Sequence, residues 1–134
     1  MLDEKIPDFR GYDDEEHRRL SDEQVRSYLG EALAAARERL APLAPAAQSA
    51  LDDLVIRTGF TNQQAFRTFE DGARNTSDFG DIEAADAEIV QLADRAATID
   101  AQAAAGYLSE VAFALDRRDD VMRSYAQRPP VSAG

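Results

Sequence analysis

The chain has 134 residues, enough for one domain with a hydrophobic core, and 44% of them are hydrophobic. Its 26 acidic residues outnumber its 15 lysines and arginines, and the net charge of −11 disfavours nucleic acids and anionic membranes as partners and favours basic protein surfaces. The sequence contains no cysteine, which excludes disulfides, thiolate nucleophiles and cysteine-based metal centres. No apolar run approaches the ~20 residues of a membrane span, and the first residues are acidic, unlike a signal peptide, so we expect a cytoplasmic protein.

The first twelve residues predict an extended arm that docks on the rest of the chain. Pro7 and Gly11 disfavour a regular helix there, while Ile6 and Phe9 are apolar and are the expected anchors. The following segment, 13–19, places its acids before its bases, the order that suits a helix dipole, and therefore predicts a short helical turn.

A long helix is predicted from residue 22 to about residue 40. Ser21 and Gln24 have the spacing of a capping box, in which the two side chains bond free backbone amides of the first turn. Apolar residues then recur at helical spacing and predict a buried stripe: Val25, Leu29, Leu33, Ala36 and Leu40. Pro45 suits the first position of the next helix.

The stretch from Ala50 to Gly72 holds the densest group of large apolar residues and predicts two helices joined by a tight turn. Gly59 supplies the left-handed residue that commonly ends a helix, and Thr61 with Gln64 forms a second capping box that starts the next one. The three phenylalanines of this stretch are expected to nucleate the core: Phe60, Phe66 and Phe69.

Part of this stretch, LVIRTGFTNQQAFRTF at 54–69, resembles the second half of an AraC-type helix-turn-helix. The resemblance rests on the turn formed by Gly59 and Phe60 and on the aromatic spacing of Phe66 and Phe69. In that family the helix after the turn enters the major groove of DNA. The resemblance therefore implies that the polar residues of this helix face bases: Asn62, Gln63, Gln64 and Arg67.

A further helix is predicted from residue 82 to residue 99, after a turn-forming cluster at 75–80. Its apolar residues recur at steps of three and four and form a narrow seam suited to packing against another helix: Ile82, Ala85, Ile89, Leu92, Ala96 and Ile99. The acids of this helix are expected to form an exposed negative face opposed only by Arg95: Asp81, Glu83, Asp86, Glu88 and Asp94.

The last helix is expected to begin with Asp100 as its cap and to bury a stripe of four residues: Ala104, Leu108, Val111 and Leu115. The charged run 116–120 interrupts this stripe, so the helix is expected to bend or end there. Residues 129–134 predict a disordered tail. With no strand pattern or second domain boundary in the sequence, we expect one all-α domain at 1–128, a bundle of four to five helices with the extended arm at 1–12.

The inventory of side chains disfavours catalysis. The chain has no cysteine, and its single histidine, His17, stands among acids, so nucleophile and base pairs lack their usual base. No zinc-protease motif or glycine-rich phosphate loop is present in the sequence. We therefore expect no enzyme activity, no metal and no cofactor.

The remaining expectation is a non-enzymatic protein–protein interaction module, such as an adaptor, a regulatory inhibitor or an immunity-type protein, that presents acids to a basic partner. The residues expected to contact that partner are Asp13, Asp14, Glu15, Glu16, Glu83, Asp86, Glu88 and Asp94.

Three alternatives stay open. One is a self-associating structural component in which copies meet through Ile82, Ile89, Leu92 and Ile99. Another is a helix-turn-helix DNA-binding regulator that uses the segment 51–73. The last is a bundle that binds a small ligand or a metal, with Tyr28, Tyr107, Tyr125 and the phenylalanines available to line a cavity.

Overall fold

A computed structural model describes residues 2–40 and 43–127. These residues form six α-helices: α1 (Leu2–Lys5), α2 (Arg18–Arg39), α3 (Pro45–Thr58), α4 (Gln63–Ala73), α5 (Gly80–Arg95) and α6 (Ala104–Ser124). Three short 3₁₀ helices accompany them: η1 (Glu15–His17), η2 (Ala96–Thr98) and η3 (Tyr125–Gln127). No strand occurs in the residues described, which confirms the predicted all-α class.

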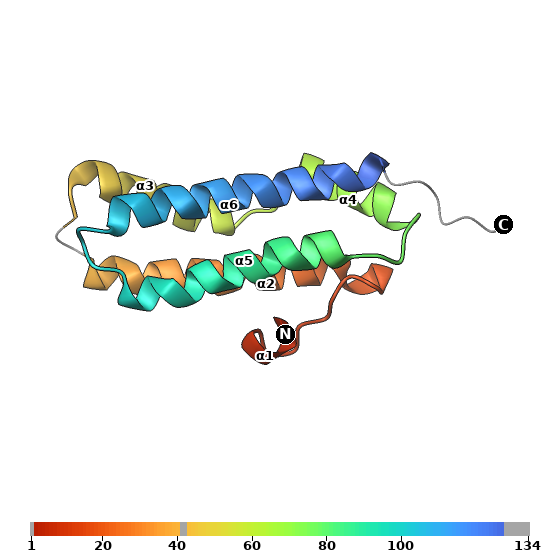
Figure 1. Ribbon diagram of the computed structural model, residues 1–134, viewed down its shortest axis with the longest axis horizontal. Helices are drawn as coiled ribbons and strands as arrows, with labels where there is room; N and C mark the ends of the chain where they lie inside the picture. The colour runs from red at the N-terminus through yellow and green to blue at the C-terminus, as the bar shows by residue number, and fades with distance from the viewer. Residues whose placement is uncertain (1, 41–42, 128–134) are drawn as a thin grey trace.

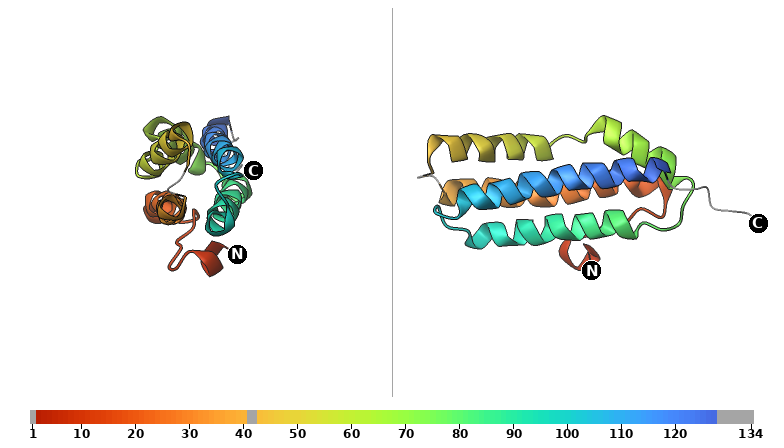
Figure 2. Two further views of the ribbon diagram at one scale, coloured as in Figure 1. Left: turned by 90° about the vertical axis from the view of Figure 1, so that its left-hand side faces the viewer. Right: turned by 45° about the horizontal axis from the view of Figure 1, so that its top comes forward.

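The long helices lie side by side around a shared interior (Figure 1). α2 packs against α3 and α5, and α5 packs against α6. α3 and α4 follow each other along α6, so two shorter helices flank one long helix (Figure 2, right). In the end-on view, α2, α5, α6 and the α3–α4 pair surround the core, and α1 lies outside them, packed on α5 (Figure 2, left).

The core forms along the predicted apolar faces. All five residues of the predicted α2 stripe and all four of the α6 stripe are buried. In α5, Ile82, Ile89 and Leu92 are buried as well. Each such leucine or isoleucine contributes roughly 1.5–3 kcal/mol when removed from water, so these faces hold the helices together.

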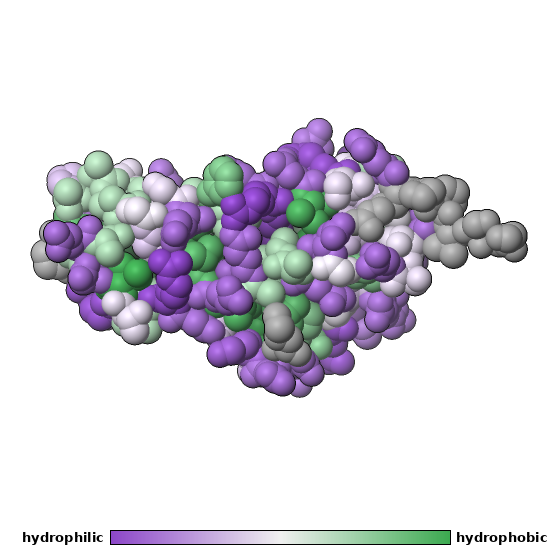
Figure 3. Space-filling view, in the orientation of Figure 1, coloured by the Kyte–Doolittle hydropathy of each residue, from purple (hydrophilic) through white to green (hydrophobic). Residues whose placement is uncertain are grey.

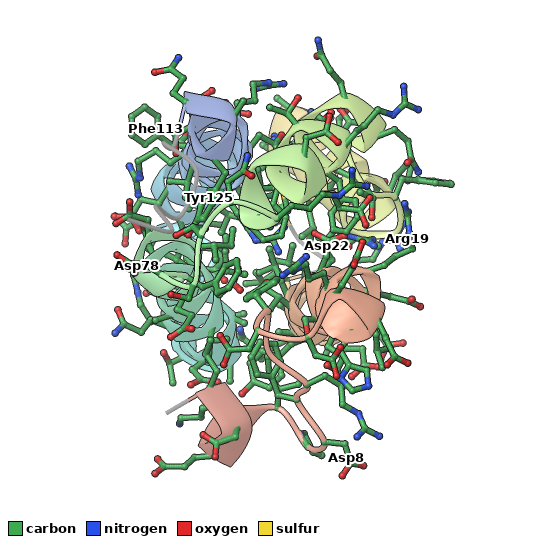
Figure 4. All side chains as sticks on the ribbon, turned by 90° about the vertical axis from the view of Figure 1, so that its right-hand side faces the viewer. Asp8, Arg19, Asp22, Asp78, Phe113 and Tyr125 are labelled. Carbon is green, nitrogen blue, oxygen red and sulfur yellow. The ribbon has the colours of Figure 1, made fainter. Side chains whose placement is uncertain are left out.

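A second apolar cluster gathers aromatic rings where α4, α6 and the N-terminal segment meet. Phe69 lies in edge-on contact with Tyr12, at 5.5 Å between ring centroids, and with Tyr125 at 4.9 Å. Tyr125 lies between the helices in Figure 4. Phe66 and Phe69 are buried as predicted, but Phe60 is 72% exposed. The expectation for Phe60 is wrong because the α3–α4 connection that carries it runs over the surface.

The N-terminal arm differs in part from the prediction. Residues 2–5 form α1, so the arm is not wholly extended, and this helix raises the number of α-helices above the four to five expected. Ile6 is buried, as expected of an anchor, and Phe9 is half-buried. The chain then turns at Gly11, with φ of 81°, and delivers Tyr12 to the interior. The tail predicted at 129–134 lies outside the described residues.

The start of α2 also differs from the prediction. The helix begins at Arg18, so Ser21 lies inside it and does not cap it. The Ser21 hydroxyl donates a hydrogen bond to the Gly11 carbonyl at 2.5 Å. This contact ties the arm to α2, and it replaces the capping box expected there.

The connection between α3 and α4 uses another cap than expected. Gly59 has a φ of −76°, so it is not the left-handed residue of the prediction. Asn62 caps α4 by accepting a hydrogen bond from the Ala65 amide at 3.1 Å. The Thr61 hydroxyl, to which the prediction gave that role, donates instead to Asp22 Oδ2 at 2.5 Å. Thr61 therefore links the connection to α2.

α6 continues without a break through residues 116–120, where a bend or an end was expected. The helix begins at Ala104, and Asp100 caps the preceding turn by accepting a hydrogen bond from the Ala103 amide at 2.8 Å. The helix continues because Arg118, in the middle of the charged run, is buried at 3% exposure and belongs to the inner face.

Candidate functional site

Three charged side chains from three helices meet in the interior. Asp22 of α2, Asp86 of α5 and Arg118 of α6 are 1%, 0% and 3% exposed, and Tyr12 of the arm, at 1%, joins them. We call these four residues the buried charge cluster. Asp22 points from α2 into the space between the helices (Figure 4). Charged side chains are almost never fully buried unless they are paired, so the pairing decides whether the fold tolerates them.

Arg118 is the centre of the buried charge cluster. Its Nε donates to Asp86 Oδ1 at 2.6 Å and its Nη1 to Asp22 Oδ1 at 2.7 Å. Its Nη2 donates to the Tyr12 hydroxyl oxygen at 3.3 Å, and that hydroxyl donates in turn to Asp86 Oδ2. Arg26 Nε donates to Asp22 Oδ2 at 3.0 Å. Across the described part of the chain, every buried side-chain nitrogen and oxygen atom has a partner.

Burial and pairing act against each other on the pKa values of these groups. Burial raises the pKa of Asp86, and Arg118 and Tyr12 offset this only in part. Burial also acts on Asp22, but Arg118 and the Thr61 hydroxyl outweigh it, so the pKa of Asp22 is lowered. Burial first, and then the charge of Asp86, raises the pKa of Tyr12 well above its ordinary 10.0. Tyr12 therefore stays protonated and serves as a hydrogen-bond donor.

An open cleft of about 550 Å³ lies between α2, the α3–α4 connection and α6. Asp22 and Arg118 belong to its lining, so the cleft reaches down to the buried charge cluster. On its wall, Arg57 Nη2 lies 2.8 Å from Asp116 Oδ1 and 3.3 Å from Asp119 Oδ2. The volume falls in the range of small-molecule sites in proteins.

Two of the predicted acidic segments come together in space. Glu83, near the start of α5, is exposed. The four acids at and just before η1 are exposed as well: Asp13, Asp14, Glu15 and Glu16. Partial burial raises the pKa of Glu83, and the charges of Asp13, Asp86 and Asp78 raise it further. We call Asp13, Asp14, Glu15, Glu16, Asp78 and Glu83 the acidic surface.

The other three acids predicted to contact a partner have different surroundings. Asp86 is fully buried, so its place on an exposed face is corrected: its side chain belongs to the buried charge cluster. Glu88 forms an ion pair with Arg117 of α6. Asp94 accepts a hydrogen bond from the Tyr28 hydroxyl at 2.6 Å, which, as the largest cause, lowers its pKa.

The apolar seam expected to join copies of the chain is used inside the fold. Ile82, Ile89 and Leu92 are 0%, 0% and 5% exposed, and Ile99 is half-buried. The three buried residues face the interior of the fold and offer no surface to a second copy while the helices stay packed. Self-association itself stays a prediction. The seam serves instead as the inner face of α5.

The residues that the helix-turn-helix resemblance implied as base readers are accessible. Gln63, Gln64 and Arg67 of α4 are exposed. Asn62 is exposed too, but its amide group both caps α4 and donates to Asp119 Oδ2 at 3.2 Å.

The sequence held a signal for the buried charge cluster that the prediction missed. Asp86 stands four residues after Ile82 and three before Ile89, which places it on the seam itself. Arg118 stands three residues after Leu115, also on the inner stripe of its helix. A charged residue at a stripe position, matched by an opposite charge on another stripe, predicts a buried pair.

No family model, curated protein or solved structure matches the chain. Within residues 2–40 and 43–127, no group of three or more histidine, cysteine, aspartate or glutamate side chains is placed to hold a metal ion. None of the helices in those residues is both long and apolar enough to cross a membrane. In the part of the chain that the structure describes, the fold is all-helical and holds a buried charge cluster below an open cleft lined largely by polar residues.

Proposed function

We propose that the protein is a non-enzymatic protein–protein interaction module that binds a basic partner through the acidic surface. The observation that carries the proposal is the gathering of like charges around Glu83: Asp13 from the segment before η1, Asp78 from the loop before α5 and Asp86 from α5 itself. Hydrophilic residues also cover much of the face seen in Figure 3. A partner that places lysine or arginine beside these acids relieves their mutual repulsion on binding.

The basic groups of the chain itself neutralise this surface weakly. Among the described residues, Glu15 Oε1 lies 4.0 Å from Arg74 Nε, and Asp14 Oδ2 lies 3.6 Å from His17 Nδ1. The side chains of both acids are more than half exposed, at 66% and 53%. Exposed ion pairs of this length stabilise little, so the acids remain available to a partner.

The test begins with a pull-down of the tagged full chain from a lysate of the source cells at low and at moderate salt. We expect a stoichiometric protein partner with a basic surface. The association rate of the two purified proteins should fall steeply as salt screens the charges.

Charge-reversal variants locate the contact. Asp13→Lys combined with Glu83→Lys should slow association, whereas Glu31→Lys combined with Glu38→Lys, at two exposed acids of α2, makes the same change in net charge and serves as the matched control. If the control slowed association equally, the effect would come from the net charge of the protein and not from the acidic surface. An association rate that the double variant leaves unchanged would overturn the proposal.

DNA binding through α4 is a second candidate, supported by the exposure of Gln63, Gln64 and Arg67 on that helix. Fluorescence anisotropy with labelled duplex DNA at low salt tests it. Arg67→Ala should weaken binding if Arg67 contacts the duplex. No change in anisotropy at low salt would remove this candidate, since phosphate contacts are strongest there.

A further inference from the structure

The cleft between α2, the α3–α4 connection and α6 has the features of a built binding site. Asp22 and Arg118 in its lining are charged, almost fully buried and held in place by the buried charge cluster. Leu115 and Met122 add buried apolar surface, and Phe60 adds an aromatic ring that is 72% exposed. Fixed polar groups beside apolar surface are typical of small-ligand sites.

The charges that line the cleft are balanced and already paired. Four aspartates and four arginines belong to the lining, and all eight take part in ion pairs with one another. The pairs at the bottom are rigid, since Asp22 and Arg118 are buried. The wall pairs of Arg57 are looser, because the side chains of Arg57 and Asp116 are 36% and 66% exposed.

This balance disfavours a ligand that carries a single charge. A cation held by both Asp116 and Asp119 takes both carboxylates from Arg57, and an anion that takes Arg57 leaves Asp116 without its cation and Asp119 with only the Asn62 amide. The Asp119 side chain is only 19% exposed, so leaving it without a cation costs more than in a fully exposed pair. A zwitterion avoids this loss because its carboxylate meets Arg57 while its ammonium group, which has three N–H donors, meets both Asp116 and Asp119.

We propose that the cleft binds a small zwitterion, of which a free amino acid with an apolar side chain is the simplest form. The ligand opens the pairs that Arg57 forms with Asp116 and Asp119 and inserts between their charges. Its side chain lies against Leu115 and covers the exposed ring of Phe60. The buried charge cluster keeps its own hydrogen bonds and holds Asp22 and Arg118 in place at the bottom of the cleft.

Three probes that share the leucine side chain and differ in charge test the proposal: L-leucine, N-acetyl-L-leucine and L-leucinamide. In mildly acidic buffer they are a zwitterion, an anion and a cation. Each is titrated at millimolar concentrations into the full chain, and backbone amide shifts are followed by NMR. We expect L-leucine to shift amides of residues 57–62 and 115–123 and to bind at least about tenfold more tightly than either analogue.

Two variants locate the contact. Arg57→Gln should weaken L-leucine binding about tenfold. Arg37→Gln is the matched control, since Arg37 Nη2 lies 2.6 Å from Asp52 Oδ1 in an exposed pair outside the cleft, and it should leave binding unchanged. Absence of binding by L-leucine, equal binding by all three probes, or shifts confined to other parts of the chain would each overturn the proposal.

Discussion

At Arg118, a guanidinium group lies inside the protein with Nε, Nη1 and Nη2 all donating to buried oxygen atoms. Removing such a group from water costs several kcal/mol, and attraction to its partners offsets this only when the geometry is complete. The intact cluster is therefore compatible with a stable fold. Without Arg118, the two aspartates would lie in the interior without the guanidinium group that donates to both of them, which should destabilise the fold.

The first prediction concerns Arg118 and its neighbour. Arg118→Met leaves Asp86 with only the Tyr12 hydroxyl among the cluster contacts, and the free energy of unfolding should fall by about 3–5 kcal/mol. Arg117→Met removes an exposed ion pair with Glu88 and should change the free energy by less than about 1 kcal/mol. Urea denaturation followed by circular dichroism measures both, and equal losses would contradict the prediction.

The second prediction concerns the buried tyrosines at alkaline pH. Burial, in the presence of Arg95 and Glu110, raises the pKa of Tyr107 from 10.0 to about 12, and the pKa of Tyr12 is raised as well. The unfolded chain loses these protons near pH 10 while the folded chain keeps them. The stability they contribute is therefore complete below pH 10 and declines as the pH rises from 10 towards 12.

Denaturant unfolding across this alkaline range measures the decline. Tyr107→Phe should make the decline shallower, because it removes one of the buried hydroxyls whose pKa is raised. A free energy of unfolding that stays constant up to pH 12 would contradict the assignment.

At the scale of the helices, periodicity predicted the inner faces of α2, α5 and α6, because the burial of an amphipathic stripe depends on local spacing. The caps were less predictable. Ser21 and Thr61 had the spacing of capping boxes, yet both hydroxyls donate to distant groups, the Gly11 carbonyl and the Asp22 carboxylate. Such partners come from tertiary packing, which a local pattern does not contain.

The candidate site was predictable only in part for the same reason. The presence of many acids near Glu83 could be predicted from the composition of this segment. Their proximity to Asp13 could not, because it depends on how the arm packs on α5. Asp86 and Arg118 stood at stripe positions, but their pairing depends on which helices are neighbours and how each is rotated. Apolar periodicity leaves both undetermined, since any helix can cover an apolar stripe.

The third prediction concerns the contact between α4 and η3. A Cβ atom at Gly72 would collide with the Tyr125 carbonyl and approach the Ala126 nitrogen to 2.8 Å, so Gly72→Ala should lower the free energy of unfolding by about 1–3 kcal/mol. A Cβ atom at Gly106, in α6, would have no atom within 4 Å, so Gly106→Ala should raise the free energy of unfolding by up to ~1 kcal/mol. Thermal unfolding of both variants checks this, and a stabilised Gly72→Ala protein would disprove the close contact.

For the whole molecule, the buried charge cluster joins the arm, α2, α5 and α6, while the aromatic cluster joins the arm, α4 and η3. Tyr12 belongs to both. Elements that share buried partners in this way lose them together, so we expect the described residues to behave as one cooperative unit.

The fourth prediction follows from that expectation. Unfolding monitored at the helices by far-ultraviolet circular dichroism and at the arm by amide hydrogen exchange should give the same free energy. Tyr12→Phe leaves Asp86 Oδ2 without its Tyr12 donor and should lower both values together by about 1–3 kcal/mol. An arm that exchanges its amides in a separate, earlier step would contradict a single unit.

The contacts of Arg118 also bear on the order of folding. Arg118 is 96 residues from Asp22 and 106 from Tyr12 along the chain, so each contact closes a long loop and forms only after much chain entropy has been lost. The two aspartates keep their hydration water until α6 docks, which makes this docking the late event. Substitutions at Arg118 should therefore accelerate unfolding far more than they retard refolding.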